Sequence, residues 1–476
     1  MIVMKFGGSS LKDPDSLHHI AEIIKENSFS RRAVVLSAVG GITDLLVQAI
    51  HNALEKDQSI SDSLEAIHAV HLPLLQEGIP DATFRQESAK RMDDLLNRLK
   101  RLLKGVAYTG EATLRTRDHI LSIGERMSVH IMAGSLKSMG VKAQGIESDG
   151  IGMIANGYWG HGTVNQQLAR KMIPNYLMPL FKKETIPVIT GFFGCTEEGD
   201  PITFGRGGSD YSAAIIADAL GAERLEVWKD VDGFLTGSPE MVEDSQFLNS
   251  LSYDETAELS YFGAKILHPR TVEPLRERKI PLVIRNTFRP EGVGTWVGSN
   301  GVSRKGIVKS VTYDRNVALL RLIGPDVGYT LELLPTLVFQ LSQMEVAVRS
   351  IFSSQTCITL LLNQEDIQRT VKHLESSPLR GIERIEPFES ISLVAIVGEG
   401  LSDAEGLVAR VITNLVQAGK HVEMIVTGAS KVAAYFIIRE DELASVVRTV
   451  HQTFFGHENT DDCMQKEWEK EDGKNV

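Results

Sequence analysis

The sequence has few cysteines, no long apolar run and no excess of positive charge. Its 476 residues include three cysteines that form no CxxC pair, and an odd, scattered set is typical of a reducing compartment. No apolar run approaches the roughly 18 residues that predict a membrane span, and the N-terminus lacks a signal-peptide layout. We therefore expect a cytoplasmic protein without a membrane partner.

The charge balance is acidic, with 50 Lys and Arg residues against 62 Asp and Glu and a formal net charge of −12. No basic stripe offsets this charge, so we do not expect nucleic acid as a partner. An anionic small molecule stays open as a ligand, because a few local cations can override the global sign. The hydrophobic content of 42% is ordinary.

A glycine-rich stretch near the middle of the chain is the strongest chemical signal. Three glycines fall within Gly205–Gly208 together with Arg206, and Ser209-Asp210 and an apolar run at helical spacing follow. This pattern predicts a loop that leads into a helix N-terminus, where free N–H groups favour anions. Arg206 offers a planar fork to a carboxylate or a phosphate. Taken alone, the stretch is equally compatible with a capped glycine turn.

The N-terminus carries a second anion-binding pattern. Ile2–Phe6 predicts a buried strand, Gly7-Gly8-Ser9-Ser10 a turn, and Asp13-Pro14 the capped start of a helix. Lys5 stands at the end of the strand. The motif is not a Walker A loop, because the lysine precedes the glycines.

Strands alternate with helices over about the first 300 residues, which predicts a parallel, three-layer α/β domain. Residues 55–118 read as a helical insertion, and one helix is expected over 119–139. That helix carries Glu125, which by itself is most simply a solvated charge. Ligands of such sheets bind at the carboxyl ends of the strands, where the glycine turns fall.

The last third of the sequence repeats. Ala318–Gly324 aligns with Ser392–Gly398, and at the same offset Leu341 falls on Leu415. Each copy reads strand, loop, helix, strand, strand, helix, which predicts two small α+β units paired in one module. Beyond about residue 457 the chain is charged and is expected to be a disordered tail.

These blocks occur in the order found in one family, and the chain resembles an aspartokinase of the amino acid kinase family followed by tandem ACT (ferredoxin-like) domains. The matching blocks are Lys5–Ser10, Ser37 with Gly41-Ile42-Thr43, Glu125, Gly205–Asp210, Trp228–Gly233 and Phe262–Pro269. The implied organisation is a catalytic domain over 1–300, ACT units over 310–390 and 391–456, and the tail over 457–476. Because the chain ends after the ACT units, we expect a monofunctional enzyme.

The resemblance implies transfer of the γ-phosphoryl group of ATP, with Mg²⁺, to the side-chain carboxylate of L-aspartate, the first step of lysine, threonine and methionine biosynthesis. It implies catalytic roles for Lys5 and Asp210, where Asp210 orients either Lys5 or a metal-bound phosphate, and no protein metal ligands. The implied aspartate-binding residues are Ser37, Thr43, Glu125, Phe192, Arg206 and Ser209. The implied ATP-binding residues are Lys5, Gly7, Gly8, Ser9, Lys229, Asp230 and Lys265.

Two departures from the family pattern affect expectations. Leu235 and Ser238-Pro239-Glu240 replace a tyrosine and Asp-Pro-Arg, which predicts weaker ATP binding. In the first ACT unit, Arg349 replaces an acid that helps to hold an effector ammonium in lysine-inhibited relatives, and Gln355 removes a second negative charge. The implied effector-binding residues are Asp326, Gly328, Tyr329, Val348, Arg349, Ser353 and Ser354. We expect lost or weakened lysine inhibition, unless Arg349 turns outward and pairs with a surface carboxylate.

Alternative functions are an inactive kinase fold that senses an amino acid, and a kinase for another acidic amino acid, such as a glutamate 5-kinase-like enzyme. Intact Lys5, Glu125, Arg206 and Asp210 argue against the inactive sensor. The ACT units are expected to join two chains into at least a homodimer through residues 310–455.

Overall fold

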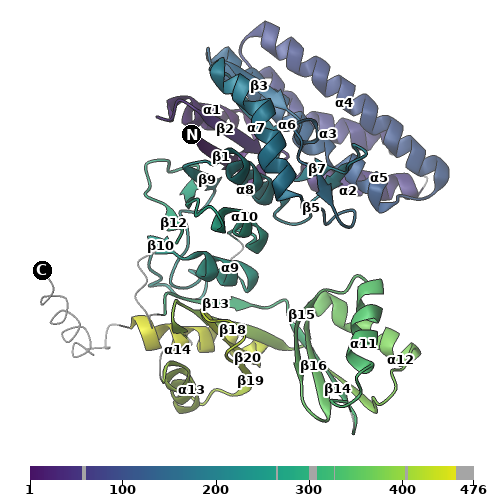
Figure 1. Cartoon of the computed structure of the whole chain (residues 1–476), viewed down its shortest axis with the longest axis vertical. Helices are drawn as coiled ribbons and strands as arrows, with labels where there is room; N and C mark the ends of the chain where they lie inside the picture. The colour runs from purple at the N-terminus through teal and green to yellow at the C-terminus, as the bar shows by residue number, and fades with distance from the viewer. Residues whose placement is uncertain (56–59, 264–265, 300–307, 326, 402–405, 457–476) are drawn as a thin grey trace, which may run out of the picture. The chain divides into compact units, whose positions relative to one another are not determined.

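The computed structural model describes residues 1–55, 60–263, 266–299, 308–325, 327–401 and 406–456 (Figure 1). The chain divides into two compact units. The first comprises residues 1–234, 248–260 and 265–302, and the second comprises 235–247, 261–264 and 303–476. Within the described ranges, every helix is too short or too polar to cross a bilayer.

An eight-stranded, mainly parallel sheet forms the centre of the first unit. Its strand order is β10-β12-β11-β9-β1-β2-β6-β3, and the β11–β12 pair is antiparallel, so β12 and β10 run opposite to the other strands. The strands are β1 (Ile2–Phe6), β2 (Arg32–Leu36), β3 (Ala143–Ile146), β6 (Ile186–Thr190), β9 (Arg224–Lys229), β10 (Ser250–Leu251), β11 (Leu282–Asn286) and β12 (Thr295–Val297). All five residues of β1 are buried, as expected for a central strand covered on both faces.

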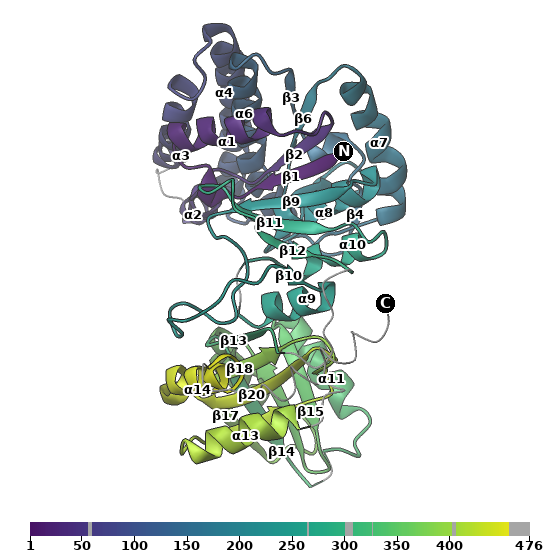
Figure 2. The same ribbon diagram turned by 90° about the vertical axis from the view of Figure 1, so that its left-hand side faces the viewer.

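Helices cover both faces of this sheet, so the predicted three-layer α/β architecture is confirmed (Figure 2). Alternate residues of β1 join a core formed with α1 (Pro14–Glu26), α2 (Ile42–Leu54) and α6 (Ile123–Ser138). On the other face, α8 (Gly208–Leu220) packs on β1 and β9, with α7 (Gln166–Lys182) against α8. The predicted start of α1 is confirmed, because the Asp13 side chain accepts a hydrogen bond from the Ser16 amide at 2.8 Å.

The helical insertion predicted for residues 55–118 is present as α3 (Ile60–Gln76), α4 (Ala82–Thr109) and α5 (Leu114–Leu121). The single helix expected over 119–139 is wrong. The chain breaks at Ser122, which ends α5 and precedes α6, and this break places Glu125 in the first turn of a new helix. Shorter elements complete the unit: β4 (Ala155–Asn156), β5 (Thr163–Val164), β7 (Phe193–Cys195), β8 (Pro201–Thr203), α9 (Tyr253–Tyr261) and α10 (Glu273–Arg276).

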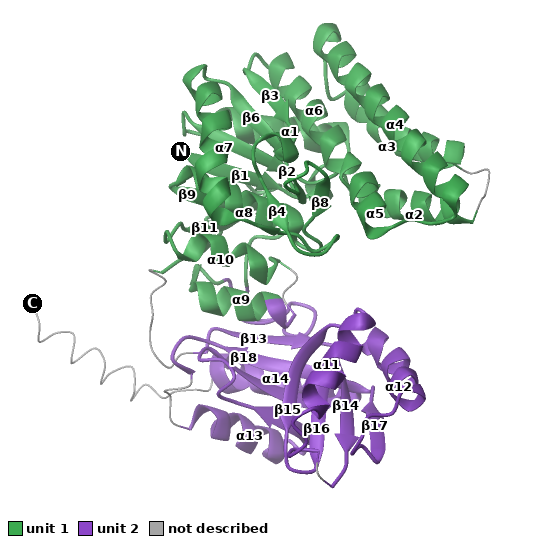
Figure 3. Cartoon of the chain, turned by 45° about the vertical axis from the view of Figure 1, so that its right-hand side comes forward, with its two compact units in different colours: residues 1–234, 248–260, 265–302 green, residues 235–247, 261–264, 303–476 purple. Residues whose placement is uncertain are grey.

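The second unit contains two antiparallel four-stranded sheets and confirms the predicted repeat (Figure 3). The first copy consists of β14 (Ala318–Ile323), α11 (Leu333–Gln343), β15 (Val348–Ser353), β16 (Cys357–Leu362), α12 (Ile367–Ser376) and β17 (Arg384–Phe388). The second consists of β18 (Ile391–Val397), α13 (Leu407–Gln417), β19 (Val422–Val426), β20 (Ala433–Arg439) and α14 (Leu443–Phe455). Each copy has its own buried apolar core.

The sheet of the second repeat, with strand order β13-β18-β20-β19, includes one strand from outside that repeat. Strand β13 (Ser310–Asp314) precedes the first repeat, yet it pairs antiparallel with β18 of the second. The amide of Val311 in β13 also donates a hydrogen bond to the carbonyl of Thr236 at 2.9 Å. The predicted boundaries at 300, 310, 390 and 456 stay a prediction, and the predicted tail 457–476 lies outside the described residues.

Candidate active site

A tight glycine turn follows β1, the strand that carries Lys5. A 3-10 turn covers Gly8–Ser10, and a Cβ at Gly8 would lie 2.5 Å from the carbonyl oxygen of Ala38, so only glycine fits there. A Cβ at Gly7 would lie 3.6 Å from the Lys5 Nζ. The Lys5 ammonium therefore lies close to Gly7 in the predicted phosphate loop.

Asp210 binds two lysines from two neighbouring strands. Its Oδ1 lies 2.6 Å from the Nζ of Lys5, at the end of β1, and its Oδ2 lies 3.3 Å from the Nζ of Lys229, at the end of β9. Lys5 and Asp210 are each 4% exposed. We call this cluster the lysine–aspartate group. It carries two cationic side chains and one anionic side chain, so it retains a local excess of positive charge.

Burial and charge shift the pKa values of this group. Burial lowers the pKa of Lys5, although the Asp210 carboxylate opposes this change. Burial pushes the pKa of Asp210 upward, but the charges of Lys5 and Lys229 outweigh it, so the pKa of Asp210 lies below its ordinary value. Asp210 is therefore ionised at neutral pH. The geometry favours the prediction that it orients Lys5, and adds Lys229, which the sequence assigned to ATP alone.

Glu125 is a buried carboxylate with spare bonding capacity. Its side chain is 3% exposed, and its Oε1 accepts a hydrogen bond from the amide of Ala38 at 3.0 Å. Its Oε2 is buried without a hydrogen-bond partner in the described part of the chain. Burial raises the pKa of Glu125 to about 8. The solvated-charge interpretation is therefore wrong, and a buried oxygen that lacks a partner indicates a ligand site.

The Gly205–Gly208 loop has the predicted form and ends in the first turn of α8. Gly205 and Gly207 both have φ of +72°, and a Cβ at Gly207 would lie 2.1 Å from the Cβ of His268. Asp210 occupies the first turn of α8. Arg206, in contrast, is exposed.

The remaining predicted residues lie around this group to different degrees. Ser37 precedes Ala38 and donates its amide to the carbonyl of Phe6, while Ser209 is 9% exposed beside Asp210. A Cβ at Gly208 would lie 2.9 Å from a ring carbon of Phe192. Three further predicted residues are exposed: Thr43, Arg206 and Asp230. In the described part of the chain, none of them forms a hydrogen bond or an ion pair with the other predicted site residues. Lys265 lies outside the described residues.

Sequence reasoning missed two supports of the site. Ser10 and Thr287 are fully buried and share a hydrogen bond of 3.1 Å between their hydroxyls, which ties the phosphate loop to the end of β11. Arg126 is 1% exposed and pairs with Glu147 and Asp149. In the sequence, the position of Arg126 directly after Glu125 is the one sign of a role for this arginine. Its partners Glu147 and Asp149 could not be predicted, because only the fold brings them to it.

The residues that depart from the family pattern belong to the second unit. The Glu240 carboxylate accepts a hydrogen bond from the Tyr313 hydroxyl at 3.3 Å, and the carbonyl of Leu235 accepts one from the Ser310 hydroxyl at 2.8 Å. Both bonds join segment 235–247 to β13. The predicted effect on ATP binding stays a prediction.

The predicted effector residues do not form one cluster. Gly328 lies against the turn after β15, because a Cβ there would meet the Ser354 carbonyl oxygen at 2.5 Å. Tyr329, Ser353 and Ser354 are exposed near it, whereas Val348 and Arg349 occupy the opposite end of β15. Asp326 lies outside the described residues.

The Arg349 guanidinium is fully engaged. It pairs with Asp314 at 2.6 Å, donates to the carbonyl of Tyr261 at 3.0 Å and lies 5.4 and 5.3 Å from the rings of Tyr261 and Phe262. The pairing with a carboxylate agrees with the alternative expectation, but the side chain does not turn outward, because that of Arg349 is 10% exposed and that of Asp314 19%. Repulsion of an effector by a free cation therefore has no geometric basis here.

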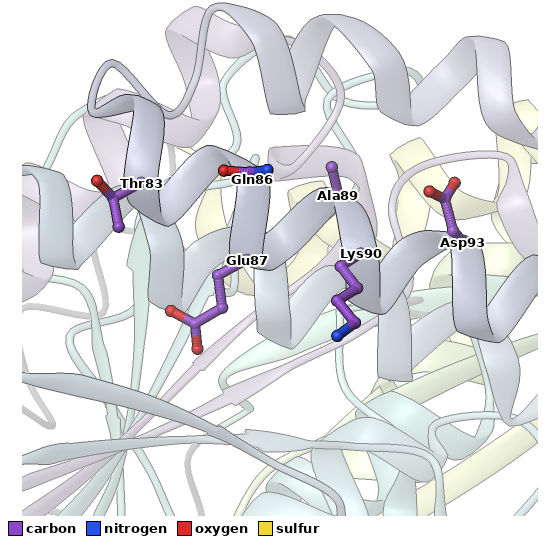
Figure 4. Close-up of a pocket in the computed structure, with 6 residues that line it drawn as sticks. All are labelled: Thr83, Gln86, Glu87, Ala89, Lys90 and Asp93. Carbon is purple, nitrogen blue, oxygen red and sulfur yellow. The ribbon is translucent and has the colours of Figure 1, made fainter.

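A hollow in the surface lies elsewhere, and the described residues hold no metal-type cluster that would compete with this site. Within the described ranges, no three His, Cys, Asp or Glu side chains are grouped to hold a metal ion. A hollow of about 500 Å³ lies along α4 alone, lined by Thr83, Gln86, Glu87, Ala89, Lys90 and Asp93 (Figure 4). None of these residues is a predicted site residue.

Comparisons with known sequences cover both parts of the chain. Residues 1–286 match the amino acid kinase family, and residues 394–454 match the ACT domain. Aspartokinase 1, chloroplastic, of Arabidopsis thaliana is 31% identical over 468 residues, which are 95% of this chain and 80% of that protein. Lysine-sensitive aspartokinase 3 of Escherichia coli (strain K12) is 29% identical, over 96% of this chain and 99% of that protein.

Solved structures are similar over the same length. The structure of E. coli aspartokinase III in complex with aspartate and ADP (R-state) has a TM-score of 0.82 at 28% identity, covering 96% of this chain and 100% of that one. The same protein in complex with lysine and aspartate (T-state) has a TM-score of 0.79 at 27% identity, covering 96% and 99%.

Proposed function

The chain belongs to the amino acid kinase family and, within it, to the aspartokinases, and we propose that it transfers the γ-phosphoryl group of ATP to the side-chain carboxylate of L-aspartate. The products are 4-phospho-L-aspartate and ADP. One observation carries this proposal: a buried, net cationic lysine–aspartate group lies at a glycine loop, in the same unit as a buried Glu125 oxygen that lacks a partner.

The reaction needs no general base, because an aspartate side chain, with a reference pKa of about 3.9, is already ionised at neutral pH. Catalysis then depends on positioning and on neutralising charge at the transferred group. Lys5 stabilises that group together with the amides of Gly7, Gly8 and Ser9. Asp210 holds the Lys5 ammonium in place, and its low pKa keeps it able to do so.

Glu125 binds the α-ammonium of aspartate, which supplies the missing partner of its Oε2. Arg206 binds the α-carboxylate, and its exposed guanidinium offers a planar fork to this group. The pocket is completed by Ser37, Thr43, Phe192 and Ser209. Pairing of an ammonium with Glu125 requires loss of the carboxyl proton.

Lys229, Asp230 and Lys265 contact ATP in this proposal. Lys229 is suited to this role because it shares Asp210 with Lys5. Mg²⁺ bound with the nucleotide would neutralise phosphate charge, and the substrate phosphates would supply most of its ligands, so no protein cage for it is required.

The test is ADP release with a panel of L-aspartate, L-glutamate, D-aspartate and L-asparagine, each with and without Mg²⁺. We expect Mg²⁺-dependent release with L-aspartate alone. Release with L-glutamate instead would assign the enzyme to another acidic amino acid. No amino-acid-dependent release, together with saturable binding of an amino acid, would support the inactive sensor.

For regulation, we propose that an amino-acid effector binds at the first ACT repeat through Gly328, Tyr329, Ser353 and Ser354, with Asp326, Val348 and Arg349 as the less supported members. Lysine is expected to act weakly, because neither position 349 nor position 355 supplies an anion for its side-chain ammonium. The weak action of lysine is thus attributed to the lack of an anion at these positions and no longer to repulsion by the Arg349 charge.

We also propose that the second unit joins two chains into at least a homodimer. Apolar side chains of α11 support this assembly, since Leu334, Val338 and Phe339 are 38%, 41% and 64% exposed. Sedimentation of the Val338→Asp/Phe339→Asp variant tests it. A lighter species is expected, and an unchanged sedimentation coefficient would contradict this surface.

The cytoplasm is proposed as the compartment. Cys195 and Cys357 are both free thiols, which suits a reducing environment. Cell fractionation would test this assignment, and recovery in an organelle fraction would contradict it.

A further inference from the structure

Arg126 is a buried cation without a role in the phosphoryl transfer described above. It follows Glu125 on α6, is 1% exposed, and forms ion pairs with Glu147 and Asp149, which are themselves partly exposed. Its guanidinium also lies 4.6 Å from the centre of the Phe193 ring. The Arg126 guanidinium therefore links α6 to two segments that are distant in sequence, 147–149 and 193–195.

Those two segments are bonded to each other. Ser148 accepts a hydrogen bond from the Thr190 hydroxyl at 2.9 Å, and its amide donates to Thr190 Oγ1 at 2.8 Å. The Ser148 hydroxyl donates to the carbonyl of Phe193 at 2.6 Å. The end of β6 and the start of β7 are thus held on both sides of residues 191 and 192.

Phe192, between these anchors, has a strained backbone. Its φ is +73°, a left-handed conformation that an aromatic residue adopts only where its surroundings enforce it. This conformation places the Phe192 ring against Gly208, the first residue of α8. The following two residues of α8 are Ser209 and Asp210.

We infer that Arg126 is a positioning residue for the amino-acid substrate, since its guanidinium holds the Phe192 wall of the pocket in register with Glu125 on its own helix. The inference rests on the proposed function, because it assigns Phe192 and Glu125 to the aspartate pocket. It predicts a defect in aspartate binding that spares the nucleotide, whose predicted contacts are at the carboxyl ends of β1 and β9, in the residues that follow them, and at Lys265.

The test compares Arg126→Met, which keeps length but removes charge and fork, with Arg126→Lys, which keeps the charge. Arg126→Met should raise KM for aspartate about tenfold or more, because small misplacements of positioning groups have effects of this size. KM for ATP should stay within about twofold of the wild type, and Arg126→Lys should recover part of the loss.

A matched control is Arg224→Met, which also removes a partly buried ion pair, with the fully buried Glu226, at the amino end of β9. It should lower the thermal midpoint as Arg126→Met does, but leave KM for aspartate unchanged. If Arg126→Met does not fold, Asp149→Asn gives a milder break and should raise KM for aspartate several-fold, without a matching rise for ATP.

Equal rises in KM for both substrates, or an aspartate effect no larger than that of Arg224→Met, would overturn the inference. Failure of the proposed function is seen separately, because wild-type protein would then show no aspartate-dependent ADP release.

Discussion

The lysine–aspartate group of the first unit and the Arg349–Asp314 pair of the second unit differ in how well their charges are matched. In the first, two ammonium groups share one carboxylate. In the second, one guanidinium has a carboxylate, a carbonyl at 3.0 Å and two aromatic rings. Two ammonium groups that share one carboxylate can still bind an anionic ligand. The Arg349 guanidinium, in contrast, already has its partners within the protein.

The strongest way to break this comparison is to remove Lys5, one of the two cations that share the Asp210 carboxylate. Lys5→Met should lower kcat about 10²–10³-fold, the loss typical of one preorganised donor to developing charge. KM values should change less, because Lys5 acts mainly on the transition state. Steady-state ADP release measures both. Lys142→Met, at an exposed ion pair with Glu184, serves as the control and should behave as wild type. Near-normal kcat in Lys5→Met would mean that the assigned geometry is wrong.

Next in size is the unmatched oxygen of Glu125. Glu125→Gln keeps an acceptor for the Ala38 amide but loses the charge, and hydrogen bonds to charged groups contribute about 1.5–3 kcal/mol, so KM for aspartate should rise about 10- to 100-fold. The wild-type enzyme should also respond to pH. Burial raises the pKa of Glu125 to about 8, so the carboxyl must lose a proton before it pairs with an ammonium.

KM for aspartate should therefore fall as the pH rises from 6 to 8 and level off above 8, while KM for ATP shows no such trend. Glu125→Gln should abolish the slope. A KM for aspartate that is independent of pH in wild-type protein would contradict a Glu125 that must lose a proton before its Oε2 binds the substrate.

A substitution of Arg206 tests whether this exposed cation takes part in substrate binding together with the buried cations of the lysine–aspartate group. Arg206→Ala should raise KM for aspartate about tenfold through loss of a charge-assisted contact, with little change in kcat, because the contact exists in the ground state and the transition state alike. Rescue of KM by Arg206→Lys to the wild-type value would show that no bidentate fork is needed. A change confined to KM for ATP would move Arg206 out of the aspartate pocket.

The smallest effect is expected at the saturated cation. Arg349→Met should change the lysine concentration for half-inhibition by less than about fivefold, since a paired, screened charge contributes little to a distant ligand. In wild-type protein, half-inhibition should require more than millimolar lysine. Gln355→Glu, which adds an anion near Ser354, should strengthen inhibition more than Arg349→Met does. The opposite order would make Arg349 a main contact of the effector.

Local patterns predicted much of the fold correctly. The alternation of strands and helices, the capped start of α1, the Gly205–Gly208 loop and the tandem repeat are all confirmed, because each depends on residues close in sequence. The family suggested by the motifs is also confirmed by the comparisons. The predicted continuous helix over 119–139 was wrong, because Ser122 breaks it within an otherwise helical pattern.

Long-range partners could not be read from the sequence. Nothing in the local pattern shows that Lys229 shares Asp210 with Lys5, that Arg126 reaches Asp149, or that β13 pairs with β18 of the second repeat rather than with the first repeat, which follows it in the chain. For Arg349, charge alone suggested repulsion of an effector. Its pairing with Asp314 depends on the packing of β15 beside the end of β13, which only the fold determines.

The most direct test of the central claim traps the product. An acyl phosphate reacts with hydroxylamine to give a hydroxamate, so ATP, Mg²⁺ and L-aspartate should yield aspartyl hydroxamate with wild-type protein and a rate lower by about 10²–10³-fold with Lys5→Met at saturating substrates. Hydroxamate from L-glutamate in place of L-aspartate, or equal rates for the two proteins, would contradict the account.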